Sequence, residues 1–206
     1  MSFRDPKDQA LSFLRFMEGW FLEPGTVSPD EAVQIQLIDG DHDDPSSYWT
    51  HVASWLSQQT NPDVLLLTFE DMKRNLHGAV SEIAQFLGLA RPDRVEAAVH
   101  NSTYEFMSSH SGPFTEPLMR AWVEEHIGIP GDGDASKVRR GRAGDGQRQL
   151  ALTTIEQVHE LWRTHVGDTF GFPTYEDLVA ELQVEPTSVL EPRVSSSPPI
   201  EPQTSQ

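Results

Sequence analysis

A glycine-rich stretch in the second half of the chain concentrates positive charge in an otherwise acidic protein. The 206-residue sequence has a formal net charge of -17 and 15 lysines and arginines. Within positions 137 to 148 stand five of these basic residues: Lys137, Arg139, Arg140, Arg142 and Arg148. Arginine can form paired hydrogen bonds to phosphate oxygens, and a glycine such as Gly141 lets the backbone approach an anion closely. The stretch therefore predicts a phosphate-binding loop, with a solvated charged loop as the alternative.

A second pattern suited to an anion stands at the N-terminus. Asp5 can cap a helix, Pro6 suits its first position, and Asp8 stands where a capping box places its acid. Arg4 directly precedes this cap, and Ser12 follows Asp5 by seven residues, two turns along the same face. An arginine and a hydroxyl at a helix N-terminus would suit a phosphate dianion. The alternative is a capped surface helix with a solvated Arg4.

Hydrophobic periodicity and capping signals predict the elements that would position these residues. We expect helices within residues 4–20, 29–39, 46–59, 76–89, 91–109, 153–172 and 174–183. Residues 29–39 could also form a strand, and residues 91–109 could form one helix or two with a break near Asn101. The continuous apolar run at 64–68 predicts a strand of the kind found inside parallel sheets.

The elements together predict a helix-rich α/β domain. A lone buried strand needs partners, so a partial parallel sheet of the P-loop type with flanking helices fits better than a helical bundle. The domain is expected to span residues 1–183, and the N-terminus is expected to enter its first helix without a preceding strand. Residues 184–206 are rich in Pro and Ser and lack periodicity, which predicts a disordered tail.

Composition narrows the possible partners. The acidic balance argues against nucleic acid, because phosphate backbones require widely distributed Lys and Arg. There is no cysteine, so a disulfide framework and a thiolate zinc site are excluded, and we expect no metal site. No apolar run approaches the ~20 residues of a membrane helix, and no signal peptide is evident. We therefore expect a cytoplasmic protein that does not associate with membranes.

Four segments in order resemble motifs of the sulfotransferase family, whose members use 3′-phosphoadenosine 5′-phosphosulfate (PAPS). "RDPKDQALS" at 4–12 resembles R-[ND]-P-x-[DE]-x-x-x-S, and "VLLLTFEDM" at 64–72 resembles L-x-[FY]-E-D-[ML]. "HNSTYEFM" at 100–107 is similar to T-S-F-x-x-M, and "VRRGRAGDG" at 138–146 to R-K-G-x-x-G-D-W. The likeness runs from about Phe3 to about Leu182. It implies transfer of a sulfuryl group from PAPS to a hydroxyl or amine of a small-molecule acceptor, without a metal.

The resemblance also implies which residues hold the nucleotide. Those implied at its 3′-phosphate are Arg4, Ser12, Arg139, Arg140 and Gly141. Those implied near its adenine are Phe69, Ser102, Thr103 and Tyr104. These residues would bind and orient the donor, and none is implied as a catalytic residue.

Departures from the family pattern limit what the resemblance implies. The family's phosphosulfate loop and its histidine base precede the R-[ND]-P segment, where this sequence begins. We therefore expect residues 1–206 to hold the nucleotide side of the site and to lack that loop and base, and none of the eight histidines is assigned as a base. Gly146 replaces the family's Trp, which would remove a stacking surface for adenine.

The dimerisation motif and the overall function leave alternatives open. The motif K-x-x-x-T-V-x-x-x-E would fall on residues 147–156, where only Glu156 matches, so dimerisation through it is not expected and the oligomeric state stays open. Besides a sulfotransferase, the sequence is compatible with a non-catalytic nucleotide-binding protein. It is also compatible with an acidic interaction protein whose basic loop pairs with its own carboxylates.

Overall fold

The structure of the protein is a computed structural model, which describes residues 1–18, 20–110, 112, 117–129 and 143–183. The predicted tail at 184–206 lies outside the described residues, as do Arg139, Arg140 and Gly141. Among the residues described, no helix is both long and apolar enough to cross a lipid bilayer.

Two short parallel strands form the sheet among the described residues. β1 (Ser2–Phe3) pairs with β2 (Leu67–Thr68), with Ser2 opposite Leu67 and Phe3 opposite Thr68. Met1 extends the ladder, because its amino group donates to the Leu65 carbonyl at 2.6 Å and its carbonyl accepts from the Leu67 N–H at 2.9 Å. The expectation that no strand precedes the first helix was wrong, since two residues are too few to show a period of two in the sequence.

The strand expected at 64–68 is shorter than predicted. Its C-terminal end is set by Thr68, whose hydroxyl accepts from the Asp71 N–H at 3.2 Å and caps α4 (Phe69–Arg74). Phe69 therefore begins a helix directly where the strand ends. The same Thr68 side chain is fully buried, so the strand-to-helix junction lies inside the protein.

Helices make up most of the described chain. Those expected from the sequence are α1 (Pro6–Glu18), α2 (Pro29–Val33), α3 (Tyr48–Leu56), α5 (Leu76–Phe86), α6 (Pro92–Asn101), α7 (Tyr104–Ser109), α10 (Leu152–Trp162) and α12 (Tyr175–Glu181). π-helical turns continue α2 (Gln34–Ile38) and α10 (Arg163–Gly167), and α11 (Asp168–Phe170) follows the second turn. Three helices were not predicted: α4, α8 (Pro117–Ile127) and α9 (Asp145–Gln149).

Capping side chains explain several of these boundaries. Ser28 and Glu31 form a capping box at α2, which favours the helical alternative for this segment. Thr103 caps α7 and so divides residues 91–109 at the expected polar break. After α5, Gly88 adopts a left-handed φ of 68°, as expected for a residue that ends a helix.

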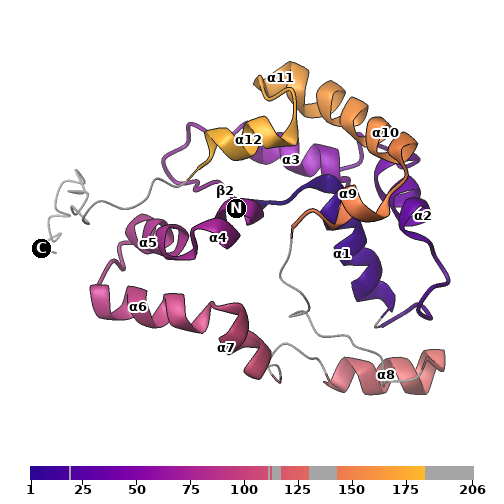
Figure 1. The fold of residues 1–206 in the computed structure, drawn as a ribbon, viewed down its shortest axis with the longest axis horizontal. Coiled ribbons are helices and arrows are strands. Elements are labelled where there is room, and N and C mark those ends of the chain that lie inside the picture. The colour runs from indigo at the N-terminus through magenta and orange to yellow at the C-terminus, as the bar shows by residue number, and fades with distance from the viewer. Residues whose placement is uncertain (19, 111, 113–116, 130–142, 184–206) are drawn as a thin grey trace, which may run out of the picture.

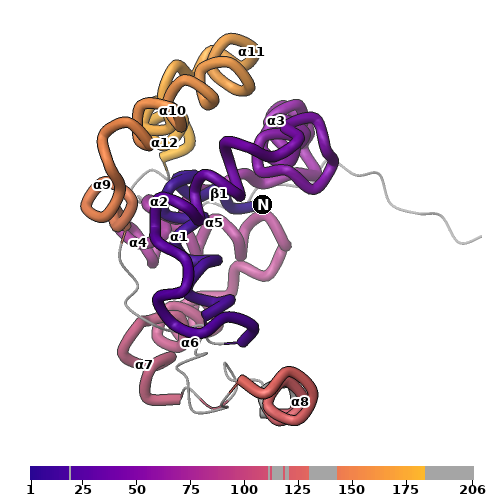
Figure 2. The backbone as a smooth tube through the Cα atoms, turned by 90° about the vertical axis from the view of Figure 1, so that its right-hand side faces the viewer, coloured from indigo at the N-terminus to yellow at the C-terminus, as the bar shows by residue number. Residues whose placement is uncertain are grey.

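The main core lies on one side of the strand pair. It joins β1, α1, α2 and α3 to α10 and α12 through side chains that include Leu11, Trp49, Val158, Trp162 and Leu178. Figure 1 shows the strands near the middle, with α3, α10 and α12 on one side and α6, α7 and α8 farthest away on the other. Figure 2 shows the same division from the side. The described chain is thus helix-rich around a small parallel sheet, as the sequence predicted.

Candidate functional site

The two strands bring Arg4 and Phe69 together. Phe3 and Thr68 lie opposite each other in a parallel pair, so the residues that follow them leave the sheet at the same edge. The guanidinium carbon of Arg4 lies 4.6 Å from the centroid of the Phe69 ring, a cation–π contact. The carboxyl ends of parallel strands are where open α/β sheets bind ligands. Two residues that sequence motifs assigned to one ligand therefore meet at a suitable place.

The Arg4 side chain keeps hydrogen-bonding capacity for a ligand. Its Nε is buried and has no hydrogen-bond partner among the described residues. Its backbone is fixed, because the Tyr48 hydroxyl donates to the Arg4 carbonyl at 2.7 Å. Burial raises the pKa of Tyr48 well above its ordinary value, and the charges of Asp5 and Glu70 raise it further, so this hydroxyl stays a donor. A buried donor without an acceptor is costly, and a ligand oxygen would relieve that cost.

Asp5 caps α1 as predicted. Its Oδ1 accepts from the N–H groups of Lys7 at 2.8 Å and Asp8 at 3.3 Å. Its Oδ2 lies 3.0 Å from Lys7 Nζ, and Lys7 is only 3% exposed. Lys7 Nζ also lies 3.3 Å from Nε2 of His159 in α10. The Lys7 ammonium is therefore engaged inside the protein and leaves Arg4 as the available cation of this turn.

Asp8 does not take the capping-box role that the sequence predicted. Its Oδ2 accepts from the Gly144 N–H at 2.5 Å, and its Oδ1 accepts from the Gly146 N–H at 2.7 Å. The carboxylate is thus turned away from the start of its own helix and toward a segment far along the chain. Buried backbone N–H groups need acceptors, and Asp8, at 2% exposure, supplies two of them.

A second set of bonds holds α9 on α1. Arg15 donates to Asp145 at 2.9 Å and to the Gln149 side chain at 2.6 Å. Arg148 donates to the other oxygen of Asp145 at 2.5 Å. Burial alone would raise the pKa of Asp145, but the hydrogen bonds and charges of Arg148 and Arg15 outweigh it and hold that pKa below its ordinary value. The C-terminal end of the predicted basic loop is therefore a short helix docked on α1, where Arg148 pairs with a carboxylate of its own segment.

Ser12 lies on the same stripe of α1 as Asp8 and Arg15. It follows Asp8 by four residues and precedes Arg15 by three, the spacings at which helical side chains are neighbours. The Ser12 side chain is exposed, and none of the described residues forms a hydrogen bond with its hydroxyl. It therefore presents a hydroxyl on the face of α1 that contacts residues 144–149.

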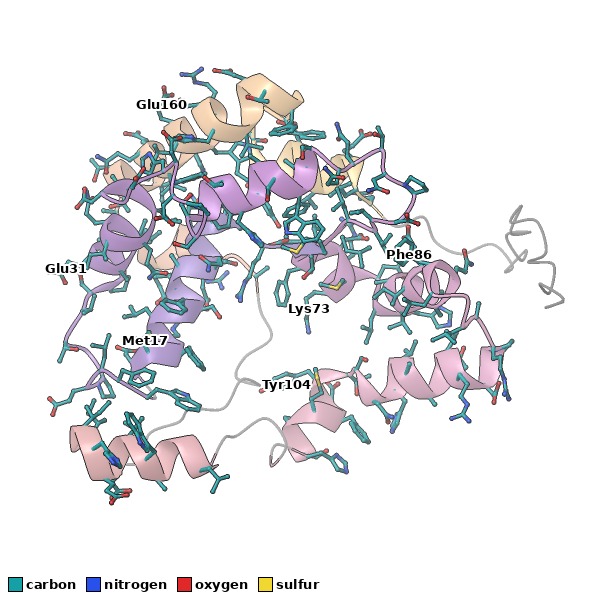
Figure 3. The ribbon with its side chains drawn as sticks, turned by 180° about the vertical axis from the view of Figure 1, so that it is seen from behind. Met17, Glu31, Lys73, Phe86, Tyr104 and Glu160 are labelled. Carbon is teal, nitrogen blue, oxygen red and sulfur yellow. The ribbon has the colours of Figure 1, made fainter. Side chains whose placement is uncertain are left out.

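Residues 102–104 lie at the turn between α6 and α7. Thr103 Oγ1 accepts from the Phe106 N–H at 3.2 Å and donates to the His100 carbonyl at 2.8 Å, so its hydroxyl caps α7. Ser102 is the C-cap residue of α6. In Figure 3, Tyr104 lies on the side of α7 that is turned toward α4, where Lys73 is labelled. The structure gives Thr103 a structural role. Among the described residues, no hydrogen bond or ring contact joins Ser102 or Thr103 to Arg4 or Phe69.

Two cavities adjoin this arrangement. One of about 430 Å³ is lined by Arg4, Gln9, Phe13, Tyr48 and His51, among others. The other, of about 370 Å³, is lined by residues of the α1 start, α4, the 143–144 segment and α12. No group of three or more His, Asp or Glu side chains arranged for a metal ion occurs in the described ranges.

A family model for the sulfotransferase domain matches residues 2–170 of this sequence. The match covers more than half of the 206 residues. The chain belongs to the sulfotransferase family.

Curated sulfotransferases share sequence with most of the chain. Sulfotransferase 6B1 of Danio rerio is 28% identical over 167 residues, which are 81% of this chain and 51% of the relative. Sulfotransferase 2A1 of Rattus norvegicus is 26% identical over 128 residues, which are 62% of this chain and 41% of the relative. The chain spans about half the length of these relatives, in keeping with the expectation that it matches a portion of the family's length.

Solved sulfotransferase structures share the fold. Mouse sulfotransferase SULT7A1 complexed with PAP superimposes with a TM-score of 0.63 at 20% identity, over 88% of this chain and 59% of that one. Retinol dehydratase in complex with androsterone and the inactive cofactor PAP gives a TM-score of 0.61 at 22% identity, over 82% and 47%. At these identities the likeness establishes the fold, and it confirms the predicted α/β class.

The packing of this chain leaves no room for the family's Trp at Gly146. A Cβ at this position would overlap Cβ of Lys7 and lie 3.2 Å from the Lys7 carbonyl carbon. No side chain fits there while Asp8 holds the Gly146 N–H. The indole that the family motif carries is therefore incompatible with this packing of the segment against α1.

Sequence reasoning missed the residues that connect the parts of the site. Asp8, Arg15 and Tyr48 each position another segment, and motif comparison gave none of them a role, although Asp8 stands at the [DE] position of the motif at 4–12. One signal was present for the first two: they share a stripe of α1 with Ser12, at helical spacings. For Tyr48 no local signal exists, because its partner Arg4 is 44 residues away.

Proposed function

We propose that residues 1–183 form the nucleotide-binding side of a sulfotransferase that takes its sulfuryl group from PAPS. The observation that carries this proposal is the contact of Arg4 with Phe69 at the carboxyl ends of β1 and β2. A cation with a buried unpartnered Nε beside an aromatic ring suits the phosphate and the base of a nucleotide. Family membership supports the same ligand, and two similar solved structures contain PAP.

We assign the 3′-phosphate to residues from both ends of the chain. Arg4 and Ser12 would hold it from α1, together with Arg139, Arg140 and Gly141. Gly144 supports this assignment because Asp8 fixes it at the start of α1. Arg140 precedes Gly144 by only four residues in the sequence, which supports its assignment to a ligand beside α1.

We assign the adenine to Phe69 and to the turn between α6 and α7. Phe69 would offer its ring beside the base, and Ser102, Thr103 and Tyr104 would approach the base from the opposite element. The direction of Tyr104 toward α4 supports this arrangement. When bound, PAPS supplies an activated sulfuryl group that moves in line to a hydroxyl or amine. These residues would bind and orient the donor, and we assign no catalytic base among residues 1–206.

The acceptor is proposed to be a small molecule. A curated relative is named as a 3-alpha-hydroxysteroid sulfotransferase, and two similar structures are complexes with androsterone and with retinol. These names support a small-molecule acceptor without identifying it. Nucleic acid and membrane are not proposed as partners, and the cytoplasm remains our prediction for localisation because the cysteine-free sequence suits a reducing compartment.

Titration calorimetry with adenosine 3′,5′-bisphosphate tests the proposed site. We expect saturable binding, and Arg4→Ala should weaken it about 10- to 100-fold, the value of a charge-assisted hydrogen bond of ~1.5–3 kcal/mol. Arg163→Ala is the matched control, because it removes the same charge from an exposed side chain that pairs with Glu160 and Asp168. It should bind like the parent.

The same titration separates the alternatives. No saturable heat with the parent chain would favour the acidic interaction protein. Binding of the bisphosphate without sulfuryl transfer from PAPS to any acceptor would favour the non-catalytic nucleotide-binding protein. An Arg4→Ala variant that binds as tightly as the parent would refute the assignment of Arg4.

A further inference from the structure

We propose that Asp8 is a positioning residue that holds residues 143–146 on the first turns of α1 and so sets the geometry of the 3′-phosphate site. The proposal deepens the proposed function and rests on it for the identity of the ligand. The attachment of residues 143–146 by Asp8 is present in the protein without ligand. The attachment and the proposed nucleotide binding can therefore be tested separately.

The Asp8 carboxylate makes a two-point attachment. Each oxygen accepts from a different backbone N–H, Oδ2 from Gly144 and Oδ1 from Gly146. The bonded residues are 136 and 138 positions away in the sequence. A carboxylate that uses both oxygens fixes the orientation of the bound segment as well as its distance. Since Asp8 is four residues from Arg4, this attachment ties residues 143–146 to the turn that carries the available cation.

The attached segment is shaped for this contact. Gly144 has a φ of 82°, a left-handed conformation that side-chain-bearing residues rarely adopt. Gly146 has no room for a Cβ, because Lys7 and the Oδ1 of Asp8 stand against it. One glycine is therefore required by backbone conformation and the other by close approach. Both requirements arise where Asp8 holds the backbone.

Asp8 and Arg15 hold different parts of the segment. Arg15 binds side chains of α9, namely Asp145 and Gln149. Asp8 binds the backbone at Gly144, which follows Arg142 by two residues in the sequence. In the sequence, this attachment is therefore nearer than the Arg15 bonds to Arg139 and Arg140, which are assigned to the phosphate. Loss of Asp8 should affect phosphate recognition even where α9 remains docked through Arg15.

Asp8→Asn tests the attachment with little change in size. Asparagine keeps one acceptor oxygen, but its NH₂ group is a donor and would point at the other backbone N–H, which is also a donor. One of the two hydrogen bonds would therefore be lost. Asp30→Asn is the matched control, because it removes the same charge from another carboxylate that bonds a distant segment. Asp30 accepts from the Ala151 N–H and the Thr154 hydroxyl through Oδ1 alone, so asparagine can keep both bonds.

Two measurements separate positioning from general stability. The first is hydrogen exchange of the Gly144 and Gly146 amides in the absence of nucleotide. The second is the ratio of affinities for adenosine 3′,5′-bisphosphate and adenosine 5′-monophosphate, which isolates the 3′-phosphate. In Asp8→Asn we expect faster exchange at both amides and a ratio lowered about tenfold or more, with monophosphate binding unchanged. In Asp30→Asn both quantities should match the parent.

The outcomes decide between the possibilities. An unchanged affinity ratio in Asp8→Asn, beside a parent that binds the bisphosphate, would overturn the positioning role and leave Asp8 a stabilising residue. If the parent binds neither nucleotide, the proposed function fails, and the hydrogen-exchange measurement alone tests whether Asp8 attaches Gly144 and Gly146 to α1. Slow exchange of Gly144 and Gly146 in Asp8→Asn would then refute it.

Gly146→Ala provides a second variant that leaves the carboxylate in place. Its added methyl crowds Lys7 and should shift the same segment, so the affinity ratio should fall in the same direction as in Asp8→Asn. Gly40→Ala is the control, since the nearest atom to its added Cβ is the Ile35 carbonyl oxygen at 3.9 Å. A parental ratio in Gly146→Ala would contradict the proposal, even if Asp8→Asn does not fold.

Discussion

The Tyr175 hydroxyl donates to Glu70 Oε2 at 2.5 Å and joins α12 to the first turn of α4. The other oxygen, Oε1, is buried without a partner among the described residues. Burial raises the pKa of Glu70, and the hydrogen bond from Tyr175 opposes this shift without cancelling it. Burial, followed by the charge of Glu70, raises the pKa of Tyr175 far above its ordinary range, so the phenol stays a donor. Beside the proposed nucleotide site, the Tyr175 hydroxyl therefore supports the ionised form of the Glu70 carboxyl group, together with backbone hydrogen bonds of Glu70 and Asp5.

Tyr175→Phe should destabilise the protein in a pH-dependent way. Because the pKa of Glu70 is raised on folding, the folded state keeps its proton to a higher pH than the unfolded state, and stability falls as pH rises from the ordinary glutamate pKa of 4.5 through the raised pKa. Removing the Tyr175 donor raises that pKa further. We expect a loss of ~1.5–3 kcal/mol at neutral pH, the value of a hydrogen bond to a charged group, and a smaller loss at about pH 4, where Glu70 is protonated. Urea unfolding at both pH values measures it.

Tyr48→Phe is the control for the pH dependence. It removes a hydrogen bond to the uncharged Arg4 carbonyl, so its cost of about 1 kcal/mol should be the same at both pH values. Equal losses at the two pH values in Tyr175→Phe would show that the Glu70 charge does not depend on Tyr175.

Individual site residues were predictable where a motif assigns them and unpredictable where a distant partner decides their role. Arg4 and Phe69 were predicted for one ligand and lie in contact. Asp8 was predicted to cap its own helix, because the capping-box pattern is local. Its actual partners are more than 130 positions away. The stripe of α1 that Asp8 shares with Ser12 marks the face, but it does not identify these partners.

Helices and strands, like single residues, were predictable where the local sequence determines them and not where distant contacts do. Most of the longer helices were predicted because their apolar spacing and caps are local properties, as Thr103 shows at the break between α6 and α7. The exception is α8, an 11-residue helix that the sequence reading missed. β1 and α9 were missed, since segments of 2 and 5 residues carry too little periodicity. α9 also depends on tertiary bonds from Asp8 and Arg15, which replace the intrinsic stability that a single helical turn lacks.

Helix α10 offers a test of such tertiary support. Its N-cap residue, Ala151, cannot cap through its side chain, and Asp30 of α2 takes over this role. Asp30 Oδ1 accepts from the Ala151 N–H at 3.0 Å and from the Thr154 hydroxyl at 2.6 Å. Asp30→Ala should therefore lower the free energy of unfolding by ~1 kcal/mol, as the loss of an N-cap does, while Asp30→Asn should stay close to the parent. Urea unfolding of the three proteins measures this difference, and an unchanged Asp30→Ala would mean that water caps α10 equally well.

For the whole molecule, the fold class could be predicted from the sequence, but the arrangement of the helices around the core could not. Strand and helix signals were enough for a helix-rich α/β domain, and the family match and solved folds agree with it. They did not indicate that the main core would join α1 and α3 to α10 and α12 while α6, α7 and α8 lie outside that cluster (Figure 1). That arrangement depends on contacts between distant segments, such as those of Lys7 with His159 and of Asp30 with Thr154.

Net charge gives a prediction at this scale. The formal charge of -17 repels an anionic nucleotide at long range, whereas Arg4 attracts it only near contact. Salt screens exposed charges beyond a Debye length of about 10 Å at 0.1 M, so it weakens the long-range repulsion more than the contact itself. The association rate constant for adenosine 3′,5′-bisphosphate should therefore rise as salt increases from about 0.02 to 0.15 M, opposite to the usual behaviour of a basic anion-binding protein. Stopped-flow tryptophan fluorescence can follow it, with uncharged adenosine as a control whose rate should not change. A rate constant that falls with salt would show that the local cluster of arginines, and not the net charge, governs the approach of the nucleotide.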